Sequence, residues 1–180
     1  MLIEASRSAL LVIDVQERLL PSMANPDGVI RGCRLLLEAA RHLSVPTVVS
    51  EQYPKGHGPT VPSLEALIPD GAITAKVHFS CLGDASLRKR ISDLGRDQII
   101  IGGIEAHVCV LQTALGLKQQ GFVPFVVEDA VSSRTGDSRV CALARLRSNK
   151  VETVTAEMVL FEWLGRAGTD TFRELSRLIR

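Results

Sequence analysis

The chain has 180 residues, of which 46% are apolar and 23% are charged. That is enough apolar sequence for one domain with a substantial core, and it excludes an intrinsically disordered protein. The net charge of +1, with both signs mixed along the chain, favours neither a nucleic-acid partner nor a membrane surface. No apolar run is as long as a membrane-spanning helix. We therefore expect one domain over residues 1–180.

The N-terminal segment and the cysteines indicate a reducing compartment. Glu4 precedes an apolar segment that leads directly into a core strand, so the start of the chain is a poor signal peptide. The four cysteines show no C-x-x-C spacing and predict neither a zinc knuckle nor a disulfide framework. We expect a cytoplasmic protein. The cysteines are Cys33, Cys81, Cys109 and Cys141.

The first 50 residues predict a strand, a helix and a second strand. The apolar run 9–13 ends at Asp14 and is typical of a parallel strand that is covered on both faces. Helical spacing of apolar residues predicts a helix from Asp27 to Leu43, with Asp27 near its cap. A short strand over residues 47–49 ends near Ser50.

Residues 51–71 interrupt this alternation of strands and helices, because they contain four prolines and three glycines. A loop of this length in a small domain is typically a lid or a pocket wall, and here it includes a short helix at 63–67. A third strand is predicted over 72–77, with Lys76 close to its end. A helix follows from Asp84, with Leu87, Ile91 and Leu94 as its buried stripe.

The segment 98–119, QIIIGGIEAHVCVLQTALGLKQ, predicts a buried strand at 99–101, a glycine pair, and then a helix that stops at Gly121. The glycines permit either a sharp turn or a close approach of the backbone. Cys109 lies where strand gives way to helix. Free N–H groups and partial positive charge at a helix N-terminus favour a thiolate there. The alternative is that Cys109 is a small buried apolar residue, like most free cysteines.

The last third of the chain continues the alternation of strands and helices. Strands are predicted at 122–128, ending at Asp129, and at 151–155, with a polar loop at 132–135 and a helix at 137–148 between them. Helices at 156–164 and 169–179 finish the chain. We therefore expect an α/β fold: a Rossmann-like, three-layer αβα arrangement around a mostly parallel six-stranded sheet. Apolar residues that would cover a sheet edge or form a subunit interface are Met158, Val159, Leu160, Phe161, Trp163 and Leu164.

Three chemically active side chains follow three of the predicted strands. Ligands bind at the carboxyl ends of parallel strands, so Asp14, Lys76 and Cys109 are expected to meet at one edge of the sheet. Asp14 would take the thiol proton and Lys76 would hold the charge. Taken singly, Asp14 is also typical of a loop cap and Lys76 of a surface lysine. His107 lies on another part of the first helical turn, so a Cys–His pair is not favoured.

These three sites lie in segments that resemble the isochorismatase-like cysteine hydrolases over nearly the whole chain. The segments are LLVIDVQE around Asp14, TAKVHFSC around Lys76 and GGIEAHVCV around Cys109. EQYPKG and GIEAHVC are similar to the branch named only for its isochorismatase domain. The resemblance implies the isochorismatase-like hydrolase fold and a Cys–Asp–Lys triad. In that triad Cys109 attacks an amide-like carbonyl carbon to form a thioester, Asp14 carries the proton, and Lys76 holds both charges.

The resemblance also implies an oxyanion hole and a substrate pocket. In the family a cis peptide bond lies ahead of the cysteine, here between Ile104 and Glu105, and the backbone N–H groups of Glu105 and Cys109 would bind the oxyanion. Loop anchoring is the alternative interpretation for two of the pocket candidates, Gln52 and Tyr53, and core packing is the alternative for Phe79. The pocket candidates are Gln16, Gln52, Tyr53, Phe79 and Ser80.

Two departures from related families bear on cofactor and substrate. Nicotinamidases bind a metal through an aspartate and two histidines, whereas His57 is the only histidine in the corresponding loop. We therefore expect no metal and no other cofactor. Ala106 stands where many amidase members have threonine, so the usual amidase substrates are not implied.

The leading interpretation is a homo-oligomeric hydrolase of a small amide-like (C–N) substrate. One alternative is an isochorismatase-type ether hydrolase, and another is a non-catalytic relative that serves as an oligomeric binding or scaffold protein. A thiol redox protein ranks last because no second cysteine lies near Cys109 in the sequence.

Overall fold

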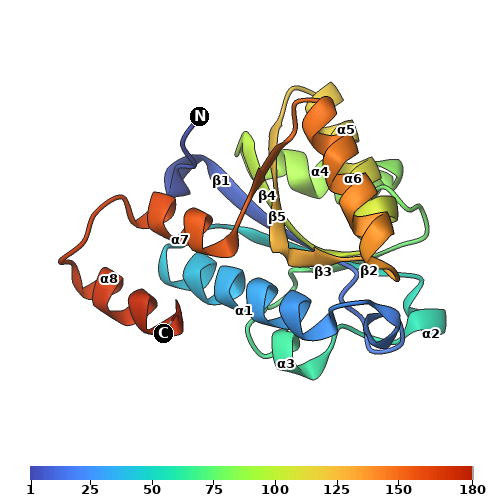
Figure 1. The fold of residues 1–180 in the computed structure, drawn as a ribbon, viewed down its shortest axis with the longest axis horizontal. Helices are drawn as coiled ribbons and strands as arrows, with labels where there is room; N and C mark the ends of the chain where they lie inside the picture. The colour runs from blue at the N-terminus through green and yellow to red at the C-terminus, as the bar shows by residue number, and fades with distance from the viewer. Residues whose placement is uncertain (180) are drawn as a thin grey trace.

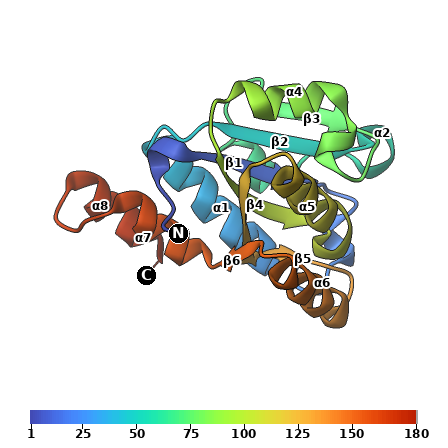
Figure 2. The same cartoon turned by 90° about the horizontal axis from the view of Figure 1, so that it is seen from above.

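A computed structural model describes residues 1–179. Within them one sheet runs in the order β3-β2-β1-β4-β5-β6, and every strand pair is parallel (Figure 2). The order reverses between β1 and β4, where a cleft for ligands is expected. The strands are β1 (Ser8–Ile13), β2 (Thr47–Gln52), β3 (Ile73–Lys76), β4 (Gln98–Ile104), β5 (Val123–Ser132) and β6 (Glu152–Val154).

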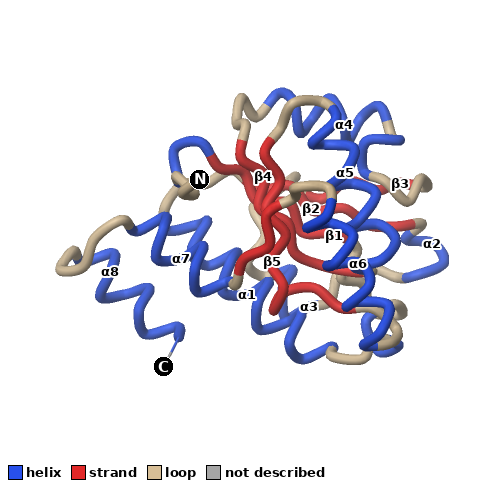
Figure 3. Tube along the Cα trace, turned by 45° about the horizontal axis from the view of Figure 1, so that its top comes forward, coloured by secondary structure: helices blue, strands red, loops and turns tan. Residues whose placement is uncertain are grey.

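Helices cover both faces of the sheet, which confirms the predicted three-layer αβα fold (Figures 1 and 3). On one side α1 and α7 pack against the sheet, and on the other lie α4, α5 and α6. The α-helices are α1 (Pro26–His42), α2 (Pro54–His57), α3 (Pro62–Glu65), α4 (Ala85–Asp93), α5 (Leu111–Gln119), α6 (Gly136–Ser148), α7 (Ala156–Leu164) and α8 (Asp170–Leu175). No helix among residues 1–179 is both long and apolar enough to cross a membrane.

Alternation along β1 explains how the sheet separates two apolar clusters. Leu10 and Val12 pack toward α1 and α7, whereas Leu11 and Ile13 pack toward α4, α5 and α6. All six residues of β1 are buried, as expected of a central strand with helices on both faces. Helix α7 contributes Trp163 to the first cluster, and the indole N–H of this residue donates to Ser8 Oγ at 2.9 Å.

Several predicted boundaries are corrected by local hydrogen bonds. Asp27 lies near the cap of α1, as predicted: Asn25 accepts the N–H of Gly28 and caps the helix, and Asp27 lies in the first turn. The 51–71 segment contains two four-residue helices, α2 and α3, in place of the single one predicted. Strand β5 continues through Ser132, so the predicted polar loop begins later.

The glycine pair does not end β4, because the strand continues to Ile104. Gly103 has φ 114°, a value that favours glycine, and it lies against the backbone of Ile13 in β1. A Cβ atom built on Gly103 would lie 2.1 Å from the Ile13 carbonyl oxygen. Of the two expectations for these glycines, the close approach of two backbones is the correct one.

Candidate active site

The strand register brings Asp14 and Lys76 to the same edge of the sheet. Ile13 in β1 is level with Ser50 in β2, and Gln52 in β2 is level with Lys76 in β3. Asp14 directly follows β1 with φ 55°, a left-handed conformation that aspartate tolerates better than most residues. The sequence alternation of strands and turns thus places both side chains beside β2.

Asp14 and Lys76 form a buried ion pair. The Lys76 ammonium is 2.7 Å from Asp14 Oδ2, and both side chains are at most 1% exposed. Three further oxygen atoms surround the ammonium: Gln52 Oε1 at 2.6 Å and the carbonyls of His78 and Phe79, each at 3.2 Å. The lysine is therefore held by four acceptors and is not a surface side chain.

Opposing effects act on the ionisation of the Asp14 carboxyl group. Burial raises its pKa, because the charged form loses its hydration, while Lys76, Ser50 and Cys109 act in the other direction. Ser50 Oγ donates to Asp14 Oδ1 at 2.7 Å. A carboxylate whose pKa is raised by burial can accept a proton from a neighbouring group.

Cys109 lies on a π-helical turn (Ala106–Val110) between β4 and α5 and is 6% exposed. Burial, and then the negative charge of Asp14, raise the pKa of its thiol to about 12. The prediction that the helix N-terminus would favour the thiolate is therefore wrong, because desolvation and Asp14 outweigh the helix. The resting group is a thiol, and its ionisation requires a base.

Two residues beside this cluster were not predicted as site residues. Ser50 bonds Asp14 directly, and the Cys81 thiol donates to Ser50 Oγ at 3.7 Å. Cys81 also lies close enough to Cys109 to raise the pKa of that thiol. The absence of a neighbouring cysteine in the sequence did not exclude one in space, since Cys81 comes from a separate 3₁₀ turn (Cys81–Gly83).

The predicted pocket residues separate into anchors and exposed side chains. Gln16 is fully buried, and its amide makes three hydrogen bonds, to Gln52 N at 2.7 Å and to the carbonyls of Gln52 and Gly58 at 3.0 and 2.7 Å. These bonds hold the 52–58 segment, and the predicted pocket role of Gln16 stays a prediction. Gln52 likewise binds Lys76 through its Oε1 atom and the Val77 carbonyl through its amide N–H, at 2.8 Å.

The remaining pocket candidates lie near the rim. Tyr53 and Phe79 are 53% and 56% exposed, so core packing of Phe79 is excluded. Ser80 is partly buried, and its hydroxyl accepts the N–H of Leu82, which caps a short turn. Of the five pocket candidates, Tyr53 and Phe79 are the exposed ones.

The segment ahead of Cys109 is held from a neighbouring loop. The Ile104–Glu105 peptide bond is cis. The Glu105 carboxylate is bound by the Arg134 guanidinium at 3.1 and 3.3 Å, and His107 Nδ1 is 2.9 Å from Ser133 Oγ. Both contacts come from the loop after β5, and His107 is engaged away from the thiol, as the sequence predicted.

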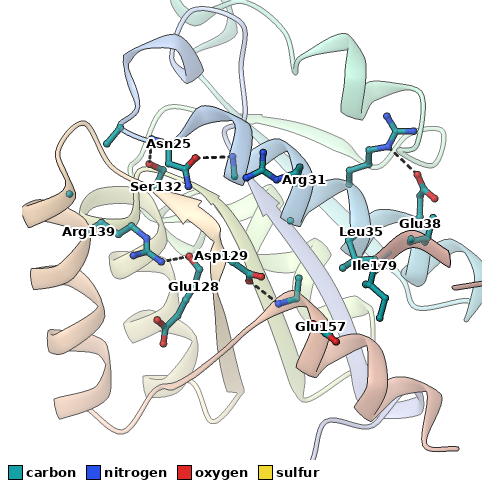
Figure 4. Close-up of a pocket in the computed structure, with 17 residues that line it drawn as sticks. Asn25, Arg31, Leu35, Glu38, Glu128, Asp129, Ser132, Arg139, Glu157 and Ile179 are labelled. Atoms are coloured by element: carbon teal, nitrogen blue, oxygen red, sulfur yellow. Dashed lines mark hydrogen bonds and ion pairs between the residues drawn. The ribbon is translucent and has the colours of Figure 1, made fainter. Parts of the chain in front are cut away.

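A cavity of about 730 Å³ lies elsewhere, between α1, β5, α6 and α7 (Figure 4). Neither Asp14, Lys76 nor Cys109 lines it. Several of its polar groups bind one another: Arg34 pairs with Glu38 at 3.1 Å, and Asp129 accepts the Ala156 N–H at 2.8 Å. Among residues 1–179, no three His, Cys, Asp or Glu side chains are grouped so as to hold a metal ion.

Comparison with known proteins identifies the family of this chain. Residues 8–158 match the family model of the isochorismatase domain. The chain belongs to the isochorismatase family. A Danio rerio protein named isochorismatase domain-containing protein 2 is 38% identical over 175 residues, which cover 96% of this chain and 86% of the relative. The similarity to the branch named only for its isochorismatase domain is thereby confirmed.

Solved structures of isochorismatase-like proteins share the fold. A Caenorhabditis elegans structure described as MAR1 ribonuclease is 36% identical, with a TM-score of 0.92 over 99% of this chain and 92% of the other. The Escherichia coli YcaC product, described as an octameric hydrolase of unknown specificity, is 26% identical, with a TM-score of 0.93 over 99% and 90%. A Phytophthora sojae relative, 36% identical over 96% of this chain and 84% of its own, is named a secreted isochorismatase effector, so a cytoplasmic location for this isochorismatase-family chain stays a prediction.

The buried thiols predict a loss of stability in alkali. The pKa values of Cys33, Cys81 and Cys109 are raised from 9.0 to about 12, 11 and 12, chiefly by burial. Above pH 9 the unfolded chain releases protons that the folded chain keeps, so the free energy of unfolding falls as pH rises from 9 toward 11. Each thiol contributes about 1.4 kcal/mol per pH unit in that range. Urea unfolding at pH 8 and pH 10 measures the effect.

Two variants calibrate this measurement. Cys33→Ala removes one buried thiol and should reduce the difference between the two pH values by about a third. Cys141→Ala, which removes the exposed thiol on α6, should leave it unchanged. An unfolding free energy in the wild type that is equal at pH 8 and pH 10 contradicts the prediction.

Proposed function

We propose that this chain is a cysteine hydrolase of a small amide-like (C–N) substrate, with Cys109 as nucleophile, Asp14 as base and Lys76 as the cation that holds their charges. The observation that carries the proposal is the buried Asp14–Lys76 pair at 2.7 Å, with the buried Cys109 thiol within hydrogen-bonding reach of Asp14. A buried ion pair is costly to build and seldom needed for stability, so its position next to a thiol favours a chemical role.

The proposed reaction has two steps. Asp14 accepts the Cys109 proton as sulfur attacks the carbonyl carbon, and it returns that proton to the leaving amine as the C–N bond breaks, which leaves a thioester. Water then attacks the thioester, loses a proton to Asp14 and releases the acid, and the thiol is restored. The backbone N–H groups of Glu105 and Cys109 are the proposed donors to the oxyanion.

Pocket and assembly are part of the proposal. Tyr53 and Phe79 present exposed rings at the ends of β2 and β3, suited to an apolar part of a small substrate. Exposed Met158 and Phe161 on α7, together with the octameric state described for the similar E. coli protein, support a homo-oligomer. Static light scattering at several concentrations tests the assembly.

Trapping the thioester tests the proposed chemistry. The protein is incubated with a panel of small amides, esters and hydroxamates, quenched in acid, and analysed by intact-mass and peptide mass spectrometry. An acyl group on the peptide that contains Cys109, with release of the matching amine or alcohol, is the expected result. Turnover that continues in Asp14→Asn with no adduct on Cys109 would refute the mechanism.

A phosphodiester substrate is the second candidate, because a structure 36% identical to this chain is described as a ribonuclease. The two candidates differ in the role of sulfur. RNA cleavage that persists in Cys109→Ala while all amides and esters remain intact would favour the ribonuclease and reject the thioester mechanism.

A further inference from the structure

Both carboxylate oxygen atoms of Asp14 are held by hydrogen bonds. Oδ2 accepts from Lys76, and Oδ1 accepts from the hydroxyl of Ser50 at 2.7 Å. Ser50 is fully buried and level with Ile13, so the β1–β2 register fixes its hydroxyl beside Asp14. A hydroxyl that donates to a carboxylate stabilises the charged form and fixes the plane of the group.

A second contact sets the direction of the Ser50 hydroxyl. The Cys81 thiol donates to Ser50 Oγ at 3.7 Å, so the single hydroxyl hydrogen of Ser50 is left for Asp14. Burial raises the pKa of Cys81 to about 11, and the thiol therefore remains a donor at neutral pH. The backbone N–H of Cys81 is itself anchored on Thr113 Oγ1 of α5 at 3.0 Å.

We propose that Ser50 is a positioning residue for the reaction, and that the chain of donors from Cys81 to Ser50 to Asp14 keeps the Asp14 carboxylate ionised and correctly oriented beside Cys109. The inference rests on the function proposed above. It assigns a role to two buried side chains that neither the triad nor the pocket uses.

The charged and titratable groups that face Asp14 come from three other segments. They are Lys76 from β3, Cys81 from the 3₁₀ turn and Cys109 from the π-helical turn. Ser50→Ala leaves all three in place; it removes the hydroxyl that donates to the carboxylate and accepts from the Cys81 thiol. Asp14 then holds its proton to higher pH, and a smaller fraction of the protein has a base ready for the thiol.

The experiment measures the rate at which iodoacetamide alkylates Cys109 between pH 5 and pH 9, with peptide mass spectrometry to identify the cysteine. Ser50→Ala is expected to lower the rate about tenfold at pH 6 and to move the acid-side inflection to higher pH. Ser50→Thr, which keeps a hydroxyl, should restore most of the rate. Cys81→Ala should act in the same direction with a smaller effect.

The matched control is Ser8→Ala. Ser8 is another fully buried serine and begins β1, at the opposite end of this strand from Asp14. Its hydroxyl contacts Trp163 and the Glu4 carbonyl. This variant loses buried hydrogen bonds without touching Asp14, so its alkylation profile should match the wild type even if its melting temperature falls. Thermal melts show that each variant is folded during labelling.

A further variant separates the two proposals. If Asp14→Asn slows alkylation while folded Ser50→Ala has the wild-type profile, the role of Ser50 is refuted and the triad stands. If Asp14→Asn itself labels like the wild type, the proposed function fails.

Discussion

Cys109→Ala is expected to abolish the burst of p-nitrophenol from p-nitrophenyl acetate and to lower the steady-state rate by at least about 10⁴-fold. The ester is a generic probe of an acylating nucleophile and needs no knowledge of the natural substrate. Loss of the sulfur removes the atom that would carry the acyl group, and what remains is binding and oxyanion stabilisation. Stopped-flow absorbance measures both the burst and the steady state.

Cys109→Ser is a second variant that tests Cys109 as the nucleophile. A hydroxyl releases its proton far less readily than a thiol, and Asp14, although its pKa is raised by burial, is too weak a base to activate it. The serine variant should therefore be nearly as inactive as the alanine variant. Cys141→Ala, at an exposed position on α6, should keep the full burst. A burst that survives in Cys109→Ala contradicts the assignment of the nucleophile.

Lys76→Met should reduce the free energy of unfolding by about 3–5 kcal/mol and remove activity. The substitution keeps a long side chain but leaves Asp14 as an unpaired carboxylate that is 1% exposed. It also leaves four oxygen acceptors without their donor. Asp14 then binds a proton more readily, since Lys76 is the main group that lowers its pKa. Urea denaturation at pH 7 measures the loss.

A double variant and a variant of a surface ion pair serve as controls for the loss of stability in Lys76→Met. Asp14→Asn combined with Lys76→Met removes both charges and keeps an amide beside Ser50, so it should be more stable than Lys76→Met alone. Lys89→Met breaks an exposed i,i+4 pair with Asp93 on α4 and should cost less than about 0.5 kcal/mol. If the two lysine variants lose equal stability, Lys76 does not compensate the buried charge of Asp14.

The strand ends were predictable because a buried strand has a recognisable apolar pattern in the sequence. A parallel strand covered on both faces needs a continuous apolar run, and the first polar residue after that run lies at the edge of the sheet. Asp14 follows β1 in this way, and Lys76 ends β3 after a shorter run. The alternation of strands and helices then predicted the three layers.

Contacts between strands could not be predicted in the same way. Nothing local to Ser50 indicates that β2 lies next to β1, so its bond to Asp14 depends on the strand order. Cys81 is 28 positions from Cys109 in the sequence, yet it lies close enough to shift the pKa of that thiol. The register of the whole sheet is needed to bring these residues together.

The glycine pair and Cys109 could not be interpreted from the local sequence alone. A glycine pair read alone permits a turn, and a cysteine at a helix start suggests a thiolate, but both inferences omit the neighbouring strand. Gly103 faces Ile13 because β1 approaches closely, and the pKa of the Cys109 thiol is raised first by burial and then by Asp14, which follows that same strand. Contacts from β1, together with burial in the folded chain, outweighed the local signals.

The bare backbone at Gly103 has a consequence for how this protein can vary. Any side chain there would collide with the Ile13 carbonyl and push apart the two strands that precede Asp14 and Cys109. We therefore expect even alanine at this position to disturb the arrangement of Asp14 and Cys109, although Gly103 has no reactive group of its own. The exposed rings of Tyr53 and Phe79, by contrast, can be exchanged without moving either strand.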